Sequence, residues 1–142
     1  MATPNEVAES MYSRDRASQW LGLRIVAVRE GYAQLNMEVK PYMANGHDIG
    51  HGGLTFALAD STFAFACNSY NINAVAAACS IEFLAPARVG DVLTATAHEQ
   101  AKSGRNGIYD VRVTNQRNEV VALFRGKSTQ IRGSVIADSK ES

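Results

Sequence analysis

The most constraining feature of the sequence is a long apolar helix pattern that runs from Gly53 to about Asn68. Alanine, leucine and phenylalanine occur on almost every side of its helical projection, and Asp60 is its only charged residue. A helix that is apolar nearly all round is a buried helix, because it has no polar face to turn toward water. The rest of the chain must therefore cover this helix on most of its sides.

The cover is predicted to be a sheet. Between Tyr32 and Val39 polar and apolar residues alternate with the period of a half-buried strand. Short turns join the strand patterns, and short turns make neighbouring strands antiparallel. Strands are expected at 24–29, 32–39, 74–84, 92–100, 108–115 and 120–131. The fold class is therefore α+β, with a curved antiparallel sheet wrapped around one long central helix.

The remaining segments are shorter. The run Ala76-Ala77-Ala78 is compatible with a helix, but the residues after it lead to a proline at 86, which is typical of a strand end. Residues 5–14 have helical composition, and a proline at position 4 suits a helix start. Residues 133–142 are polar and are predicted to form a frayed tail. The length of 142 residues indicates a single domain, 1–142.

Bulk charge and the termini narrow the choice of partners. Lys plus Arg and Asp plus Glu balance at 14 each, so the net charge favours neither nucleic acid nor an anionic membrane. Residues 1–9 lack the apolar run of a signal peptide, and the stretch 49–67 contains Asp60 and other polar residues that argue against a membrane span. We expect a cytoplasmic protein. Cys67 and Cys79 stand in apolar surroundings and are expected to be buried reduced thiols rather than a disulfide or a metal pair.

A glycine-rich loop leads into the helix. The segment from Asn45 to Gly53 holds four of the eleven glycines and two of the three histidines of the chain. Asp60 follows seven residues after Gly53, and a carboxylate inside an apolar helix is costly unless it is paired or solvated. Asp60 is therefore either a functional carboxylate or a structural one held by hydrogen bonds. The loop beside it favours function.

The pattern Asn45-Gly46-His47, His51-Gly52-Gly53 and Ala59-Asp60 resembles the hotdog-fold acyl-CoA thioesterases, and among them the phenylacetic-acid-degradation (PaaI) branch. Segments that look like the same branch are 66–69, 83–86, 90–91 and 122–127. The resemblance covers nearly the whole chain and implies the hotdog fold. One position departs from the wider superfamily, since Asp48 stands where many members carry a glycine.

The resemblance implies an acyl-CoA thioesterase in which water attacks the thioester and releases a carboxylic acid and CoA, with no metal or redox cofactor. It also implies an aryl acyl group, such as phenylacetyl or its ring-hydroxylated forms. Gly53, at the expected helix N-terminus, offers free N–H groups and a partial positive charge to a developing oxyanion. Asp60 would act as general base or as nucleophile. The bland alternative is that Gly52 and Gly53 only make a tight turn into the helix.

Four further residues are assigned to the site. Asn45 would hydrogen-bond the water or the thioester, or is only an Asn-Gly turn residue. His51 would orient the loop or contact the substrate. Ser61 and Thr62 adjoin the base, where each hydroxyl would bond the carboxylate or the water, or else bond back to the helix backbone.

Substrate binding is assigned to Gly52 and Phe63 as well as to Ser61 and Thr62. Phe63, together with Tyr42 and Phe56, is a candidate for lining an acyl pocket, although core packing explains the phenylalanines equally well. Candidates for binding the CoA phosphates, each also explicable as a solvated surface charge, are Arg88, Lys102, Arg105 and Arg125. The loop histidines lack a clear third ligand, so no metal site is predicted.

The spacing of Gly53 and Asp60 predicts shared sites. Seven residues return the chain to nearly the same helix face but separate the two groups by roughly 10 Å along the axis. A nucleophile must lie about 3–3.5 Å from the carbon it attacks. Two antiparallel helices around a two-fold axis would bring Gly53 of one subunit opposite Asp60 of the other. A homodimer with two shared sites is therefore expected, and the resemblance implies that dimers pair into tetramers.

Two alternative functions stay open. A hotdog-fold hydratase or dehydratase acting on an acyl thioester would use a histidine in its acid–base chemistry, and His51 is a candidate. A non-catalytic acyl-CoA binding protein would retain the pocket without hydrolysis, but it usually carries an effector domain, for which the segment before Trp20 is too short.

Overall fold

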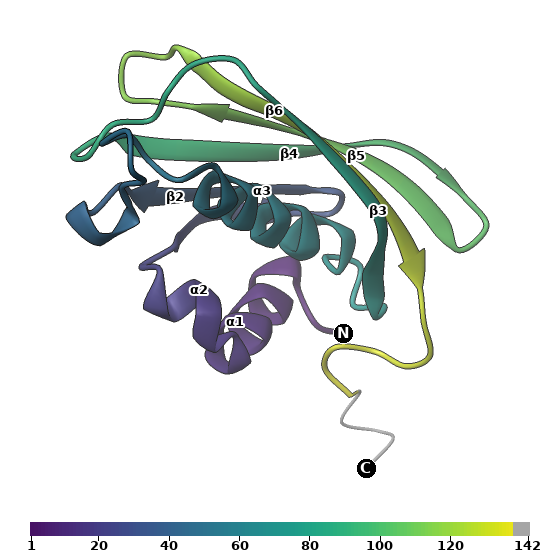
Figure 1. Ribbon diagram of the computed structural model, residues 1–142. Coiled ribbons are helices and arrows are strands. Elements are labelled where there is room, and N and C mark those ends of the chain that lie inside the picture. Colours follow the sequence, from purple (N-terminus) through teal and green to yellow (C-terminus); the bar gives the residue numbers. More distant parts are fainter. Residues whose placement is uncertain (138–142) are drawn as a thin grey trace.

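The computed structural model describes residues 1–137 and shows a six-stranded antiparallel sheet curved around one long helix, α3 (Gly52–Cys67) (Figure 1). The order across the sheet is β1-β2-β4-β5-β6-β3. The strand bounds are β1 Arg24–Arg29, β2 Tyr32–Glu38, β3 Ala74–Phe83, β4 Val92–Ser103, β5 Asn106–Thr114 and β6 Val120–Gln130. The predicted α+β arrangement is confirmed, and so is each predicted strand.

The core lies between the concave face of the sheet and α3. Ala33, Leu35 and Met37 of β2 are at most 1% exposed, as their alternation predicts. From the helix, Phe63 packs against the bare backbone of Gly126, where a Cβ would come within 2.8 Å of the ring. This close approach explains why β6 carries a glycine at its centre.

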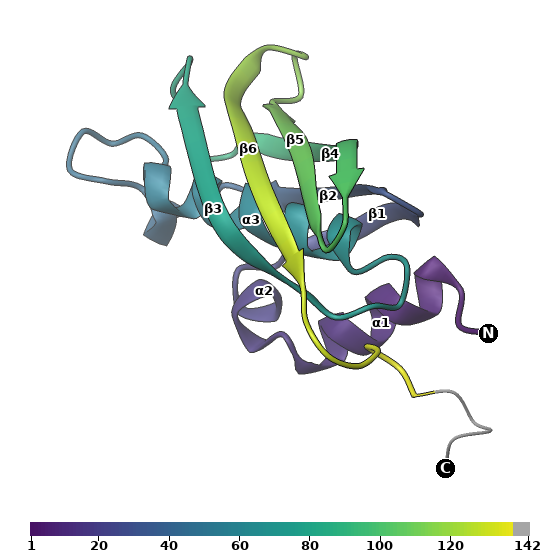
Figure 2. The ribbon, with the colours of Figure 1, turned by 90° about the vertical axis from the view of Figure 1, so that its right-hand side faces the viewer.

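The N-terminal arm, defined as residues 4–20, covers the side of α3 that faces away from the sheet (Figures 1 and 2). Its first helix, α1 (Pro4–Arg14), starts with a capping box formed by Thr3 and Glu6. Asp15 ends α1 and at once caps α2 (Arg16–Trp20) with its side chain. The sequence patterns missed α2 and the short helical turn η1 (Pro41–Met43), because neither is long enough to show a helical period.

Three predicted boundaries move. Helix α3 begins at Gly52, one residue earlier than expected. The strands predicted at 92–100 and 108–115 extend toward each other, since β4 runs to Ser103 and β5 starts at Asn106, and Gly104 at φ +60° makes the tight turn between them possible. The predicted frayed tail is wrong as far as Ile136, which exchanges two hydrogen bonds with the side chain of Asn71. Residues 138–142 lie outside the described residues.

Strand β3 is an open edge of the sheet (Figure 2). It pairs only with β6, and eight of its ten residues are exposed. Cys79 lies in this strand and is exposed, which contradicts the prediction of a buried thiol, whereas Cys67 on α3 is buried as predicted. Both thiols are free. The reason for the error is that the apolar surroundings of Cys79 form an uncovered edge rather than a core.

Candidate active site

The loop before α3 is held by its own backbone and by one side chain. The Oδ1 atom of Asn45 accepts hydrogen bonds from the N–H groups of His47 (2.9 Å) and Ile49 (3.3 Å), so Asn45 shapes the loop as an Asn turn does. Asn45 also lines the pocket beside the loop. Asp48 adopts φ +62°, the left-handed conformation that glycine favours, so the departure from the superfamily glycine leaves this turn in glycine-like geometry.

The first turn of α3 separates the two glycines. His51 is the N-cap, and its Nδ1 atom accepts a hydrogen bond from the Gly53 N–H at 2.9 Å. The N–H predicted to polarise a carbonyl is therefore already bonded within the loop. Within residues 1–137 the N–H of Gly52 has no such acceptor. The open donor at the helix N-terminus is thus Gly52 rather than Gly53.

Gly52 lines a pocket of about 470 Å³, which we call the glycine pocket. A Cβ at Gly52 would lie 3.1 Å from the ring of Phe83, so only glycine leaves this surface open beneath that ring. The other lining residues are Asn45, Ile49, Gly50, Thr55, Phe83, Leu84, Ala85, Pro86, Ala87 and Val121. The lining of the glycine pocket thus combines apolar side chains with the amide of Asn45 and with Gly52, whose N–H has no acceptor within residues 1–137.

Asp60 lies in a second pocket of about 360 Å³, which we call the aspartate pocket. Its walls include Met11 and Arg14 from α1, Phe63 from α3 and Val75 from β3. Burial raises the pKa of the Asp60 carboxyl, and the nearby negative charge of Asp15 raises that pKa further. The carboxylate is partly buried and has no ion pair within the described residues. These properties match a base rather than a solvated surface residue.

Of the three residues that follow Asp60, two point into the core and one points toward the N-terminal arm. The Thr62 hydroxyl is fully buried and donates to the Leu58 carbonyl (2.8 Å), which is the bond back to the helix backbone that the sequence left as the alternative to substrate binding. Phe63 is 1% exposed and packs against Tyr109 and Phe124, so it is mainly a core residue that forms the floor of the aspartate pocket. Ser61 turns toward the N-terminal arm, where its hydroxyl meets that of Ser18 at 3.0 Å.

The sequence analysis missed the contribution of the N-terminal arm to this pocket. Met11 and Arg14 line it, and Asp15 bonds Ser18, whose hydroxyl meets that of Ser61, the residue after Asp60. The available signal was an aspartate three residues before Ser18, which is a helix N-cap spacing. Nothing in the local sequence places that cap beside Asp60, because the contact joins residues 43 apart.

The two pockets do not meet within one protomer. The glycine pocket takes in the C-terminal end of β3 at Phe83, and the aspartate pocket takes in its N-terminal end at Ala74, Val75 and Ala76. The predicted site residues therefore form two groups, Asn45 with Gly52 and Asp60 with Ser61. Each group has chemistry that the other lacks.

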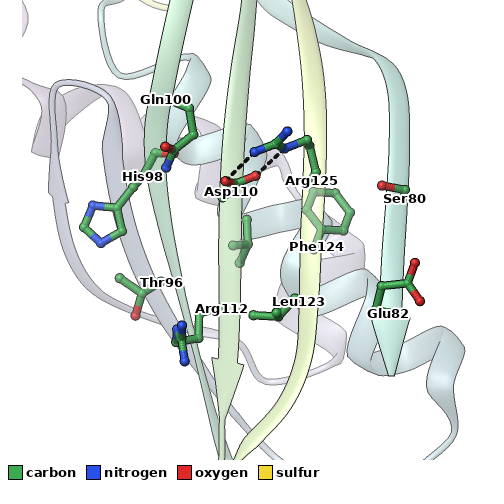
Figure 3. Close-up of a pocket in the computed structure, with 11 residues that line it drawn as sticks. Ser80, Glu82, Thr96, His98, Gln100, Asp110, Arg112, Leu123, Phe124 and Arg125 are labelled. Carbon is green, nitrogen blue, oxygen red and sulfur yellow. Dashed lines mark hydrogen bonds and ion pairs between the residues drawn. The ribbon is translucent and has the colours of Figure 1, made fainter. Parts of the chain in front are cut away.

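A third pocket, of about 470 Å³, lies on the opposite, outer face of the sheet (Figure 3). Its walls carry His98, Arg112 and Glu82, and none of the predicted catalytic residues. Arg125, a predicted phosphate ligand, is held there by two bonds to Asp110 of 2.6 and 2.8 Å. Lys102 lies over the Tyr70 ring. Arg88, which follows the glycine pocket residue Ala87, stays exposed beside that pocket.

Comparison with known proteins decides the family, since the model of the thioesterase superfamily matches residues 47–122. The chain belongs to the thioesterase superfamily. It is 46% identical over 132 residues to acyl-coenzyme A thioesterase PaaI of Escherichia coli K12, covering 93% of this chain and 94% of that protein. The solved structure of E. coli PaaI superposes with a TM-score of 0.91 over 92% of this chain and 95% of that one.

Two more solved structures are similar. A variant of phenylacetic acid degradation protein PaaI from Thermus thermophilus has a TM-score of 0.79 at 34% identity, covering 82% of this chain and all of that one. A protein of Streptococcus mutans, solved with bound acetyl CoA, has a TM-score of 0.75 at 26% identity and covers 79% and 90%. The predicted hotdog fold and the assignment as a thioester hydrolase are confirmed by this membership.

Within residues 1–137, this superfamily member has neither a candidate membrane span nor a candidate metal site. Its helices are all too short or too polar to cross a membrane. No three histidine, cysteine, aspartate or glutamate side chains of the described residues gather into a metal-binding group.

Proposed function

We propose that the protein hydrolyses aryl-acyl-CoA thioesters, such as phenylacetyl-CoA or ring-hydroxylated phenylacetyl-CoA, to the free acid and CoA in phenylacetate degradation. The relatives from E. coli and T. thermophilus carry the PaaI name, and the S. mutans protein binds acetyl CoA. The aspartate pocket supports an aryl group, because Met11, Phe63 and Val75 give it apolar walls. The thioester end of the pantetheine arm would then bind in the glycine pocket.

The observation that carries this proposal is the position of the two pockets at opposite ends of β3. A two-fold axis near the middle of β3, close to Ala78, makes the β3 strands of two copies run antiparallel. The start of β3 in one copy then lies beside the end of β3 in the other. In such a homodimer the glycine pocket of each subunit adjoins the aspartate pocket of its partner, and two complete sites form.

The exposure of β3 supports the same dimer. An open apolar edge strand is a template for pairing with another strand, and soluble proteins normally cover or charge such an edge. Here the edge includes Val75 at 45% and Phe83 at 54% exposed, and charge appears only at Glu82. A second copy of β3 would satisfy the free backbone groups and bury this surface.

In the shared site, Gly52 and Asp60 have complementary roles. The thioester oxygen accepts a hydrogen bond from the Gly52 N–H, with the amide of Asn45 beside it. Asp60 of the partner subunit takes a proton from water as the water oxygen bonds the carbonyl carbon. Collapse of the tetrahedral intermediate breaks the C–S bond, and the thiolate of CoA takes up the proton. In the alternative route Asp60 attacks the carbon itself, and breakage of the C–S bond expels the CoA thiolate and leaves a mixed anhydride. Water then hydrolyses the anhydride to the free acid and the Asp60 carboxylate, and the proton that the water gives up passes to the thiolate.

Isotope labelling separates the two routes. In a single turnover in heavy-oxygen water, label in the product acid indicates a base. Label in the Asp60 carboxylate indicates a nucleophile.

The remaining features of the proposal concern assembly and place. We infer a single domain over 1–142, with dimers that pair into a homotetramer. Free thiols in both cysteines accord with a reducing compartment, so we place the protein in the cytoplasm. No metal or redox cofactor enters the reaction as written. Among the predicted phosphate ligands, Arg88 is best placed for the CoA phosphates, because it is exposed beside the glycine pocket.

The hydratase alternative gains no support from His51. Its Nδ1 atom is used as the helix cap, so the ring is anchored to the loop as the orienting role requires. An enoyl-CoA that loses absorbance without thiol release would restore that alternative.

A panel of acyl-CoA esters tests the proposal. Free thiol release is expected to be fastest with phenylacetyl-CoA or its hydroxylated forms and slower with acetyl-CoA, because the latter leaves the aspartate pocket empty. Equal rates across the panel would contradict the aryl assignment. Binding of every ester without hydrolysis would contradict the enzyme itself and favour an acyl-CoA binding protein.

A further inference from the structure

A hydrogen-bonded chain links the N-terminal arm to the catalytic helix. Ser18, in α2, is 1% exposed, and its Oγ atom lies 2.5 Å from Asp15 Oδ2 and 3.0 Å from Ser61 Oγ. The Ser18 N–H also donates to Asp15 Oδ1 at 2.9 Å. Both oxygens of the Asp15 carboxylate are thus engaged by Ser18 alone.

The direction of the chain follows from the proton count. A carboxylate only accepts hydrogen bonds, so the single hydroxyl proton of Ser18 points to Asp15. Ser18 Oγ then has only lone pairs left for Ser61, and the Ser61 hydroxyl must donate to it. The charge of Asp15 therefore orients two hydroxyl groups in series and strengthens both bonds.

This chain fixes the wall of the aspartate pocket. Asp15 follows directly after Arg14, and Ser61 follows directly after Asp60. The arm contributes Met11 and Arg14 to the pocket that contains Asp60. Securing Ser18 to Ser61 therefore sets the distance between that wall and the carboxylate.

We propose that Asp15 is a positioning residue for the reaction, which through Ser18 and Ser61 locks the N-terminal arm onto α3 and holds a second negative charge beside Asp60. This inference rests on the proposed role of Asp60 as base. The lock shapes the aryl end of the site. The charge favours the protonated form of Asp60 and makes its carboxylate a stronger base.

The other titratable groups around Asp60 come from three elements. Arg14 of α1 shares its pocket, Cys67 lies about two turns further along α3, and Cys79 lies in β3. Burial raises the pKa of both thiols, so at neutral pH they carry no charge that would mask that of Asp15. Arg14 carries the opposite charge, so Asp15 is the negative group whose removal is expected to lower the pKa of Asp60.

Two variants separate the charge from the lock. Asp15→Asn keeps an N-cap and an acceptor for Ser18 but removes the charge, so the acid limb of the kcat/KM profile is expected to shift to lower pH. Ser18→Ala keeps the charge but cuts the link, so KM for phenylacetyl-CoA is expected to rise about three- to tenfold with the acid limb in place. Glu9→Gln, an equal charge change on the exposed side of α1, is the control and is expected to change neither quantity.

The outcomes are distinct. If a folded Asp15→Asn protein keeps the wild-type acid limb, the charge of Asp15 does not act on Asp60. If the Ser18→Ala protein keeps the wild-type KM, the link through Ser18 does not shape the aryl end of the site. A fall in Tm in both variants without either kinetic change shows a structural cap only. If Asp60→Asn hydrolyses phenylacetyl-CoA normally, the role of Asp60 on which this inference rests fails, whereas the proposed function fails only if the wild type releases no thiol from the acyl-CoA panel.

Discussion

The two ends of the site are built by different means. At the glycine pocket, chemistry comes from backbone: a loop held by Asn45, a helix cap at His51, and a free N–H at Gly52. At the aspartate pocket, it comes from a side chain made basic by its surroundings, which include an arm from elsewhere in the chain. A backbone site tolerates few changes of shape, whereas a buried carboxylate is sensitive to every charge near it. In the proposed dimer, neither half of the site is a catalyst alone.

The largest effect is expected at the aspartate end. Asp60→Asn should lower kcat by about 10³- to 10⁴-fold, because the amide neither accepts the proton of water nor attacks the thioester. Thiol release from phenylacetyl-CoA measures this loss. Asp110→Asn, on the outer face of the sheet, removes an equal charge and should leave kcat unchanged.

Asp60→Asn should also stabilise the protein at neutral pH. Because the pKa of Asp60 is raised in the folded state, that state binds the proton more tightly than the unfolded chain does. The free energy of unfolding therefore falls as the pH rises from the ordinary aspartate pKa through the raised pKa of Asp60. At any higher pH the folded protein stays destabilised by the same amount. The Tm of Asp60→Asn should exceed that of the wild type at pH 7, and the difference should vanish below about pH 4. An unchanged Tm at pH 7 argues against a buried charge.

At the glycine end, Gly52→Val should lower kcat by about 10²- to 10³-fold, since a side chain there fills the oxyanion position.

Mixing the Asp60→Asn protein with the Gly52→Val protein tests whether the two ends of one site come from different subunits. After subunit exchange, half of the dimers pair one variant with the other, and one of their two sites is intact. About one quarter of wild-type activity should return. Activity that stays at zero after exchange, as followed by native mass spectrometry, would place both groups in a single subunit's site.

The strand that joins the two ends is the next target. Ala78→Glu should repel a second copy of β3, so that the molecular mass measured by light scattering falls and activity at micromolar concentration drops at least about tenfold. Val26→Glu, on the other edge strand β1, is the control and should leave mass and activity unchanged. A full-size, active Ala78→Glu protein rules out pairing through β3.

A smaller effect is expected at the helix cap. His51→Ala removes the acceptor of the Gly53 N–H and should lower the free energy of unfolding by about 1 kcal/mol. His51→Asn keeps an acceptor at the cap and should recover most of that loss in denaturant melts. If both variants are as stable as the wild type but equally inactive, His51 contacts the substrate instead.

The smallest effects concern CoA. Arg125→Ala should leave KM unchanged, since its guanidinium is held by Asp110 on the far face of the sheet. Arg88→Ala should raise KM about two- to fivefold, and the difference should shrink at high salt. If Arg125→Ala raises KM and Arg88→Ala does not, the CoA phosphates bind on the outer face of the sheet instead.

The sequence predicted each local element long enough to show a period. The alternation around Leu35 indicated the inward face of β2, and the apolar composition of α3 predicted that the sheet would curve around it. The sequence did not predict short elements such as α2, because a helix of five residues shows no period and is stabilised by a cap and by packing. The predicted burial of Cys79 failed for a related reason: an apolar strand reads the same whether it lies in a core or at an uncovered edge.

For the site, the sequence by itself determined the groups to which we assign the chemistry: a glycine turn before a buried helix, and a lone carboxylate seven residues after Gly53. The fixed geometry of a helix then predicted that each site is shared by two subunits. Only the tertiary structure decided which N–H is open, because His51 bonds Gly53 and leaves Gly52 free. It also decided that Ser61 turns to Ser18 while Thr62 turns inward. The contact of Ser61 with Ser18 joins residues 43 apart, and local spacing carries no record of it. The bonds of Gly53 and Thr62 span only two and four residues, but spacing alone does not fix the side-chain rotamers that make them.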